Sequence, residues 1–162
     1  MHGFPAYVGL GSNLRDPIAQ LHAAFDELAK LPDTLLVLRS SLYRSSPMGP
    51  VAQPDFCNAV AGLLTELDAR SLFAELRRAE TRMGREPARV RWGPRVIDLD
   101  LLVYGDERRS DADLVLPHPG IAERNFVLQP LAEIAPDLRV PGLGRAASLA
   151  AGASTEGLWK IA

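Results

Sequence analysis

The sequence contains a single cysteine, Cys57, and only two lysines, Lys30 and Lys160. One cysteine can form neither an internal disulfide nor a cysteine-based zinc cluster. No apolar run approaches the roughly 18 residues that span a membrane, and the N-terminus lacks the charged start and apolar core of a signal peptide. We therefore expect a cytoplasmic enzyme or binding protein that does not associate with membranes.

The overall composition is ordinary for one soluble domain covering residues 1–162, with 47% hydrophobic and 23% charged residues. The net charge of −2 gives no reason to expect a nucleic-acid partner. Positive charge is nevertheless concentrated in the middle of the chain. We call this group the arginine cluster; its members are Arg77, Arg78, Arg82, Arg85, Arg89, Arg91 and Arg95. Planar guanidinium groups suit phosphate binding.

The arginine cluster leads into residues 96–104, which predict a buried strand interrupted by Asp98 and Asp100. Side chains alternate across a strand, so both carboxylates share one face with Cα atoms roughly 6.6 Å apart. Like charges on one face repel, and Mg²⁺ would offset that repulsion because it prefers carboxylates, phosphate oxygens and water. The pattern favours a site for Mg²⁺ and a polyphosphate. The alternative is an edge strand with a polar face and an arginine ion pair.

The first half of the chain predicts two strands and a helix. Residues 6–10 predict a strand that ends in a Gly11-Ser12-Asn13 turn. Asp16 and Pro17 form a helix start, and apolar residues recur at helical spacing to about Leu31. Gly9-x-Gly11 lacks the third glycine of a dinucleotide-binding turn, which favours a plain strand-to-helix connection. Residues 34–43 predict the second strand.

The remaining chain adds further strands and helices. A proline-rich loop at residues 44–54 is followed by a strand at 56–67 and by a helix at 69–83, capped by Asp68. A second loop at 85–94 precedes the aspartate strand, and we expect both loops to be mobile walls that close over substrates. Residues 114–116 predict a short edge strand, and residues 123–135 and 145–152 predict helices.

This βαββαβ order predicts an α+β fold, a ferredoxin-like sandwich with a mainly antiparallel sheet. We expect the helices on one face and loops and ligands on the other. Four polar positions allow more than one interpretation. Asn58 is a surface polar residue or reads the edge of a flat heterocycle, and His118 is structural or catalytic. Arg77 and Glu80 are three apart on a helix, where the usual outcome is a weak surface pair.

An ordered set of motifs closely resembles the 6-hydroxymethyl-7,8-dihydropterin pyrophosphokinase family of folate biosynthesis over about residues 6–140. The motifs are Gly11-Ser12-Asn13, Ser46-Pro47-Met48-Gly49, Gln53-Pro54-Asp55-Phe56-Cys57-Asn58, Glu80-x-x-x-Gly84-Arg85, Arg91-Trp92-Gly93-Pro94-Arg95-x-x-Asp98-Leu99-Asp100 and Pro117-His118. The resemblance implies the sandwich fold and transfer of pyrophosphate from ATP to a pterin hydroxymethyl group, which releases AMP. It also implies a monomer whose partners are these two small molecules.

The resemblance further implies roles for individual residues. Asp98 and Asp100 would hold two Mg²⁺ ions, and Arg85 and Arg95 would act with them as catalytic residues. The implied ATP contacts are Arg77, Glu80, Arg85, Arg91, Arg95, His118 and Arg124. The implied pterin contacts are Ser45, Ser46, Pro47, Met48, Phe56, Asn58, Trp92 and Phe126. Phe56 and Phe126 would sandwich the ring, Asn58 would bind its edge, and Trp92 would seal the site.

The chain departs from the family pattern at four positions. Arg77 stands in place of a glutamine, and Phe56 stands in place of a tyrosine while keeping the stacking face. Pro119 removes a possible phosphate donor, and Asp113 occupies a place where an arginine can lie near the adenine. None of these departures touches the aspartate pair.

Two other functions fit parts of the pattern. An RNA-binding sheet would stack bases on strand aromatics, but the negative net charge and an acidic pair in what we expect to be a central strand oppose it. A Mg²⁺-dependent nucleotide hydrolase would also use two carboxylates and arginines. Turnover with and without a pterin distinguishes all three functions.

Overall fold

The chain follows the expected βαββαβ order, except that the strand expected at residues 34–43 is divided into two, and smaller elements come after it. A computed structural model describes residues 3–47, 49–50, 52–85 and 96–161. The elements are β1 (Phe4–Ser12), α1 (Pro17–Ala29), β2 (Thr34–Arg39), β3 (Tyr43–Ser45), β4 (Phe56–Thr65), α2 (Ala69–Arg82), β5 (Asp98–Tyr104), β6 (Arg109–Ser110), β7 (Val115–Leu116), the 3₁₀-helix η1 (Ile121–Glu123), α3 (Asn125–Ile134), β8 (Arg139–Val140), β9 (Gly144–Arg145), α4 (Ala146–Ala151) and β10 (Leu158–Lys160).

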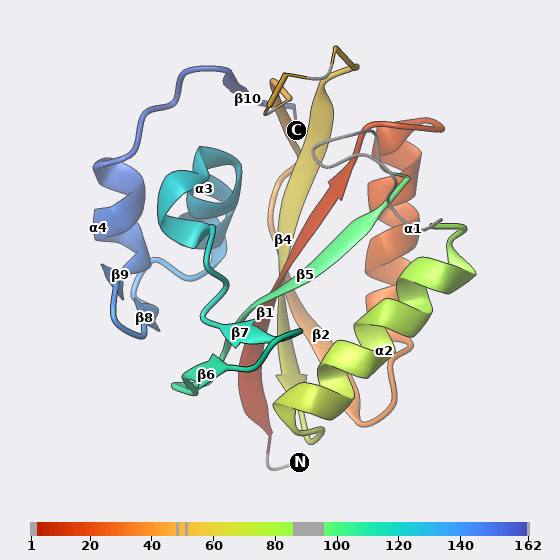
Figure 1. Ribbon diagram of the computed structural model, residues 1–162, viewed down its shortest axis with the longest axis vertical. Helices are drawn as coiled ribbons and strands as arrows, with labels where there is room; N and C mark the ends of the chain where they lie inside the picture. The colour runs from red at the N-terminus through yellow and green to blue at the C-terminus, as the bar shows by residue number, and fades with distance from the viewer. Residues whose placement is uncertain (1–2, 48, 51, 86–95, 162) are drawn as a thin grey trace.

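Six of the strands form one antiparallel sheet, in the order β10-β3-β4-β1-β5, with β2 also paired to β4 (Figure 1). β2 and β3 follow one another along the same side of β4. β2 pairs with residues 61–65, and β3 pairs with residues 56–58. Among the described strands, β5 pairs with β1 alone and lies at the edge of the sheet. The expected central position of the aspartate strand was therefore wrong.

The two predicted helix caps are confirmed. The Asp16 carboxylate accepts a hydrogen bond from the Ala19 amide at 3.4 Å, and Pro17 begins α1. The Asp68 carboxylate accepts from the Ser71 amide at 2.7 Å, at the start of α2. Each cap satisfies an amide that has no partner within its own helix.

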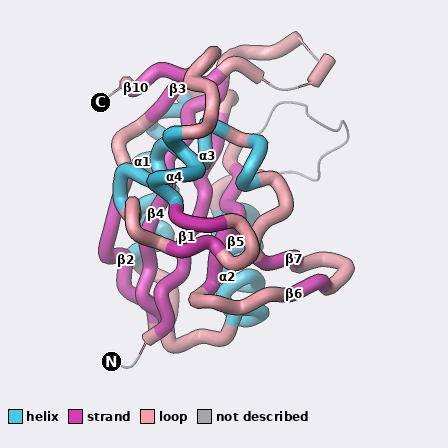
Figure 2. Tube along the Cα trace, turned by 90° about the vertical axis from the view of Figure 1, so that its left-hand side faces the viewer, coloured by secondary structure: helices cyan, strands magenta, loops and turns pink. Residues whose placement is uncertain are grey.

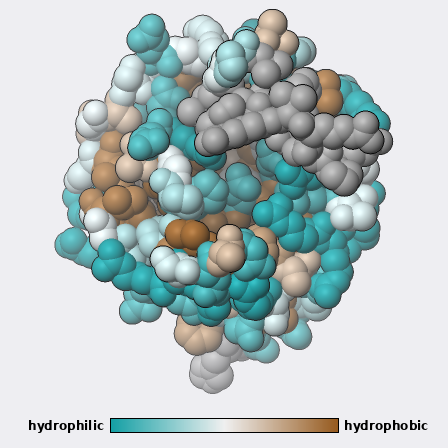
Figure 3. All heavy atoms as spheres, in the orientation of Figure 1, coloured by the Kyte–Doolittle hydropathy of each residue, from teal (hydrophilic) through white to brown (hydrophobic). Residues whose placement is uncertain are grey.

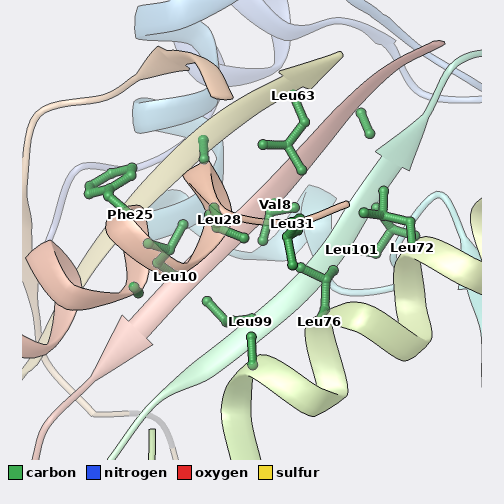
Figure 4. Close-up of a cluster of buried hydrophobic side chains, with 14 of the residues drawn as sticks. Val8, Leu10, Phe25, Leu28, Leu31, Leu63, Leu72, Leu76, Leu99 and Leu101 are labelled. Carbon is green, nitrogen blue, oxygen red and sulfur yellow. The ribbon is translucent and has the colours of Figure 1, made fainter. Parts of the chain in front are cut away.

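α1 and α2 cover one face of the sheet and enclose the larger hydrophobic core. In Figure 4, Leu99 and Leu101 of β5 extend toward the α2 leucines Leu72 and Leu76. All four side chains are buried, as is Val8 of β1. Because strand side chains alternate, this contact directs the residues between and before those two leucines to the opposite face.

The sequence suggested that the opposite face of the sheet is free of helices, and this prediction was wrong. α3 lies against this face and α4 packs on α3 (Figure 1), and apolar residues of both helices belong to a second hydrophobic cluster with Val60 of β4 and Leu102 of β5. α3 carries Val127, Leu128 and Leu131 as a buried stripe, which needs an apolar partner. The sheet therefore has helices on both faces, and any ligand site on this face must lie beside α3.

Two further differences from the sequence prediction lie along the sheet edge. The strand expected at residues 34–43 is interrupted because the Ser40 hydroxyl accepts a hydrogen bond from the Val60 amide at 2.8 Å. β10 was not predicted, and it pairs with β3 near the C-terminus (Figure 2).

Hydrophilic side chains cover much of the face shown in Figure 3, with hydrophobic ones grouped between them. None of the helices within the described residues is long and apolar enough to cross a membrane.

Glu133 links α3 to the chain just before β3. Its carboxylate accepts hydrogen bonds from the Tyr43 hydroxyl at 2.6 Å and from the Ser41 amide and hydroxyl at 3.0 and 2.9 Å. These residues are about 90 positions apart in the sequence, so the bonds fix the distance between α3 and β3. This linkage is the Glu133 bridge.

Candidate active site

One cavity of about 380 Å³ lies on the sheet face that α3 and α4 partly cover. The residues that line it come from β1, β3, β4 and β5, from the segment after α2 and from the start of α3. They are Gly9, Leu10, Gly11, Ser45, Ser46, Phe56, Asn58, Ala59, Arg85, Asp98, Asp100, Leu102, His118, Arg124, Phe126 and Val127. Ten of these were predicted from the sequence as site residues, so the fold brings most of that set together.

Asp98 and Asp100 both line the cavity, as strand alternation predicted. Leu99 between them is buried against α2. No group of three or more histidine, cysteine, aspartate or glutamate residues is placed to hold a metal within the described part of the chain. Two carboxylates suit Mg²⁺, whose remaining ligands are phosphate oxygens and water, and they do not suit a closed zinc site.

Arg85 lies beside this pair. Its Nη2 atom is 3.2 Å from Asp98 Oδ1, and its Nη1 atom is 2.9 Å from Glu80 Oε1. The Nε atom of Arg85 is buried without a hydrogen-bond partner within the described residues. An unpaired buried donor next to a cavity favours an anionic ligand there. The edge position of β5 and the Arg85–Asp98 ion pair also match the alternative interpretation of this strand.

Burial raises the pKa of Asp100, and the charge of Glu80 raises it further. Arg124, Arg77 and Arg85 act in the opposite direction. The aspartate therefore carries its negative charge at a free-energy cost in the ligand-free protein, since nearby positive charge does not balance it. A bound cation would supply the missing charge, which supports the fit to Mg²⁺.

Glu80 pairs with Arg77 as the helix spacing predicted, but it is buried, with 3% of its side chain exposed, so the pair is not the surface pair expected from the sequence. Its Oε2 accepts a hydrogen bond from the Leu99 amide at 2.7 Å. Its Oε1 accepts from Arg77 at 2.8 Å and from Arg85 at 2.9 Å. Glu80 thus joins α2 to the aspartate strand and orients Arg85 from behind the cavity.

His118 lines the cavity, and its ring is held in a defined state. Burial lowers its pKa from 6.5 to about 4, and Arg124 and Arg77 lower it as well. The neutral ring accepts a hydrogen bond at Nδ1 from the Gly120 amide at 3.1 Å. The ring proton therefore lies on Nε2, where it is a donor.

The His118 pKa predicts a pH dependence of stability in the ligand-free protein. Between about 4 and 6.5 the unfolded chain binds more protons than the folded one, so stability falls as pH drops through this range. His118→Gln is expected to remove this component, as measured by urea unfolding at a series of pH values. A midpoint near 6.5 for the His118 ring in an NMR titration would contradict the assignment.

Asn58 and Ser45 are buried together at the other end of the cavity. Asn58 Nδ2 donates to Ser45 Oγ at 2.7 Å. Phe56 and Phe126 also line the cavity, and the Arg124 guanidinium lies 5.9 Å from the centre of the Phe126 ring. This end therefore combines two aromatic rings with one amide, which suits a flat polar heterocycle.

Several predicted residues lie elsewhere. Arg77 is largely exposed, lies 4.7 Å from the Phe73 ring centre, and does not line the cavity. Pro47 is half-buried outside the lining set. Asp113 pairs with Arg70 at 3.0 Å, away from the cavity. The predictions for Met48, Arg91, Trp92 and Arg95 lie outside the described residues.

Sequence reasoning missed the glycines of β1 and the function of Asn13. Gly9 and Gly11 line the cavity, and glycine within a strand is the signal that could have identified them. Asn13 Nδ2 donates to Gln53 Oε1 at 2.8 Å and to the Pro54 carbonyl at 3.0 Å. It thereby ties the end of the proline-rich loop to the end of β1.

Comparison with known proteins identifies the family. A sequence model of the 7,8-dihydro-6-hydroxymethylpterin-pyrophosphokinase (HPPK) family matches residues 7–136. The chain belongs to the HPPK family. Among HPPK relatives, the 2-amino-4-hydroxy-6-hydroxymethyldihydropteridine pyrophosphokinase of Haemophilus influenzae is 49% identical over 136 residues, which cover 84% of each chain. The protein of the same name from Pseudomonas aeruginosa is 44% identical over 155 residues, covering 96% of this chain and 95% of that one.

The fold agrees with solved HPPK structures. The crystal structure of wild-type Plasmodium falciparum HPPK-DHPS with pteroate superposes with a TM-score of 0.72 and 13% identity. The match covers 92% of this chain and 44% of that longer chain. At this identity the likeness shows the fold, which is the ferredoxin-like α+β sandwich predicted from the sequence.

Proposed function

We propose that this protein transfers a pyrophosphoryl group from ATP to the hydroxymethyl group of 6-hydroxymethyl-7,8-dihydropterin, a step of folate biosynthesis. The products are the pterin diphosphate and AMP. The observation that carries the proposal is one cavity lined by a carboxylate pair and arginines together with Asn58 and two phenylalanines. Membership of the HPPK family supports both substrates.

At the phosphate end, Asp98 and Asp100 would hold Mg²⁺, in our proposal two ions. The bound ions would supply positive charge against the triphosphate. The chain's own donors bind the phosphate oxygens. Arg85 does so while Glu80 holds its guanidinium, and His118 does so through Nε2–H. Arg124 lies next to them, and Arg77, Arg91 and Arg95 complete the proposed nucleotide contacts.

At the pterin end, the ring lies between Phe56 and Phe126, and Asn58 binds its edge. Ser45 and Ser46 line the cavity beside it, and Pro47, Met48 and Trp92 complete the proposed pterin contacts. Stacking between aromatic faces suits a planar bicyclic ring.

The reaction is a single displacement. The hydroxymethyl oxygen forms a bond to the β-phosphorus of ATP, the bond from that phosphorus to the α,β-bridging oxygen breaks, and AMP departs with that oxygen. Loss of the hydroxyl proton is assisted by one aspartate of the pair. Alignment of the two substrates and neutralisation of charge supply most of the acceleration, and no covalent enzyme intermediate is needed.

The test is the identity of the products. Incubation with ATP, Mg²⁺ and the pterin alcohol is expected to yield AMP and the pterin diphosphate, and AMP is expected only when the pterin is present. AMP or ADP formed without pterin would instead favour a nucleotide hydrolase. No turnover would favour a binding module.

The domain organisation, oligomeric state and location of the protein are also proposals. We propose a single pyrophosphokinase domain over residues 1–162, acting as a cytoplasmic monomer on small molecules and not on nucleic acid. The net charge of −2 supports the last point. A solution mass near 17.6 kDa, measured by light scattering, is the expected result for a monomer.

A further inference from the structure

Three residues form a straight row across the cavity floor. Gly11 of β1 pairs with Asn58 of β4 on one side and with Asp98 of β5 on the other. Directly paired residues of an antiparallel sheet direct their side chains to the same face, and neighbouring strands lie about 4.8 Å apart. The two side chains assigned to opposite ends of the substrate therefore flank a position that has no side chain.

The fold does not require glycine at position 11. Its backbone is extended within β1, and it is not among the glycines with positive φ. Among the described residues, a Cβ atom there would meet Asn58 Oδ1 alone, at 3.5 Å, which is ordinary van der Waals contact. Glycine in a strand interior weakens the strand and often marks a place where a ligand approaches the backbone.

Gly62 of β4 provides the contrast. A Cβ atom at Gly62 would lie 3.0 Å from Leu38 Cβ and 3.2 Å from Leu38 Cδ1. Glycine at position 62 is therefore explained by the packing of β2 on β4, and this residue does not line the cavity. No such neighbour explains Gly11.

The amide of Asn58 is oriented toward the open position. Its Nδ2 is committed to Ser45 Oγ at 2.7 Å, and its Oδ1 faces the place where a Gly11 side chain would stand. Both Asn58 and Ser45 are buried, and their hydrogen bond holds the amide in place beside the cavity. A ring lying over Gly11 would meet a hydrogen-bond acceptor and would need to present N–H groups along that edge.

We propose that Gly11 is a specificity-determining residue, whose bare backbone is the floor on which the pterin ring lies between Asn58 Oδ1 and the Asp98–Asp100 pair. This inference rests on the proposed function. The strands that carry Asn58 and Asp98 are two spacings apart, about 10 Å. A bicyclic ring with its N–H edge at Asn58 and its hydroxymethyl arm toward the aspartates fits this span only if nothing projects from Gly11.

The test compares Gly11→Ala and Gly11→Val with the unaltered protein. Pterin affinity is measured by fluorescence titration in the presence of Mg²⁺ and a non-hydrolysable ATP analogue, and analogue affinity is measured separately by calorimetry. We expect pterin binding to weaken about tenfold for alanine and at least about a hundredfold for valine, following the displacement of the ring. Analogue affinity and the melting temperature are expected to stay unchanged.

Gly62→Ala is the matched control, with the opposite expected pattern of a lower melting temperature and unchanged pterin affinity. If Gly11→Val also melts early, Gly11→Ala carries the test, because its Cβ meets nothing closer than 3.5 Å. Pterin binding by Gly11→Ala and Gly11→Val equal to that of the unaltered protein would overturn the inference, as would equal weakening of pterin and analogue. Absence of pterin binding by the unaltered protein would overturn the proposed function itself.

Discussion

Asp98→Asn and Asp100→Asn are each expected to lower turnover by at least about a hundredfold, the scale on which loss of one charge-stabilising group acts. Asparagine keeps the size of the side chain and removes the negative charge that holds Mg²⁺. Because the effect is electrostatic, binding of the pterin at the Asn58 end should change little. Steady-state AMP formation at saturating ATP and pterin measures the loss.

Asp100→Asn is also expected to increase the free energy of unfolding of the ligand-free protein at neutral pH. The folded-state pKa of Asp100 lies above the ordinary 3.8. Its favourable contribution to stability is thus present below about 3.8 and lost as pH rises through the raised value. Asparagine has no charge to bury, so the free energy of unfolding of Asp100→Asn should exceed that of the unaltered protein at neutral pH. The difference should vanish in acid, where Asp100 is protonated.

Asp26→Asn, on the exposed side of α1, is the control, for which we expect unchanged activity and stability. Urea unfolding at pH 3.5 and pH 7 gives the comparison. Full turnover in both Asp98→Asn and Asp100→Asn would remove the proposed role of the pair. A lower stability of Asp100→Asn at neutral pH would show that its charge is already compensated without a cation.

Glu80→Ala is expected to lower the free energy of unfolding by about 3 kcal/mol, because it removes a buried acceptor shared by three donors. The Leu99 amide loses its partner, and among the described acids the partly buried Arg85 guanidinium keeps Asp98. Turnover should fall as well, since Arg85 is no longer held beside the cavity. Chemical denaturation and steady-state assays measure the two effects.

Glu75→Ala is the matched control on the same helix. Glu75 pairs with Arg78, whose side chain is 60% exposed, and such pairs contribute about 0–1 kcal/mol. We expect this variant to retain its turnover and nearly all of its stability. Similar losses in Glu80→Ala and Glu75→Ala would mean that burial of Glu80 does not matter.

The sequence predicted those parts of the fold and the site that depend on local periodicity. Strand alternation was enough to place Asp98 and Asp100 on one face, and capping residues were enough to start α1 and α2. Lining residues at distant positions, such as Asn58 and His118, came from the family motifs. Most of these share one cavity because the βαββαβ order brings β1, β4 and β5 side by side.

The failures depended on contacts between distant segments. Nothing in the helix spacing of Arg77 and Glu80 indicates that Glu80 reaches the Leu99 amide, because that bond requires α2 to pack on β5. The position of β5 at the sheet edge and the cover provided by α3 depend on tertiary pairing in the same way. Gly11 was not predicted to contact the substrate, because the absence of a side chain becomes informative only when the residues around it are known.

The Glu133 bridge has a consequence for the width of the pterin end. Phe126 belongs to α3 and Ser45 belongs to β3, so the gap between these two walls is set by a carboxylate that does not itself line the cavity. A small change at Glu133 or Tyr43 would therefore alter the separation of α3 and β3, and with it the distance between Phe126 and Ser45. Redesign of the pocket for a broader ring could therefore begin at the Glu133 bridge and leave every residue that contacts the substrate unchanged.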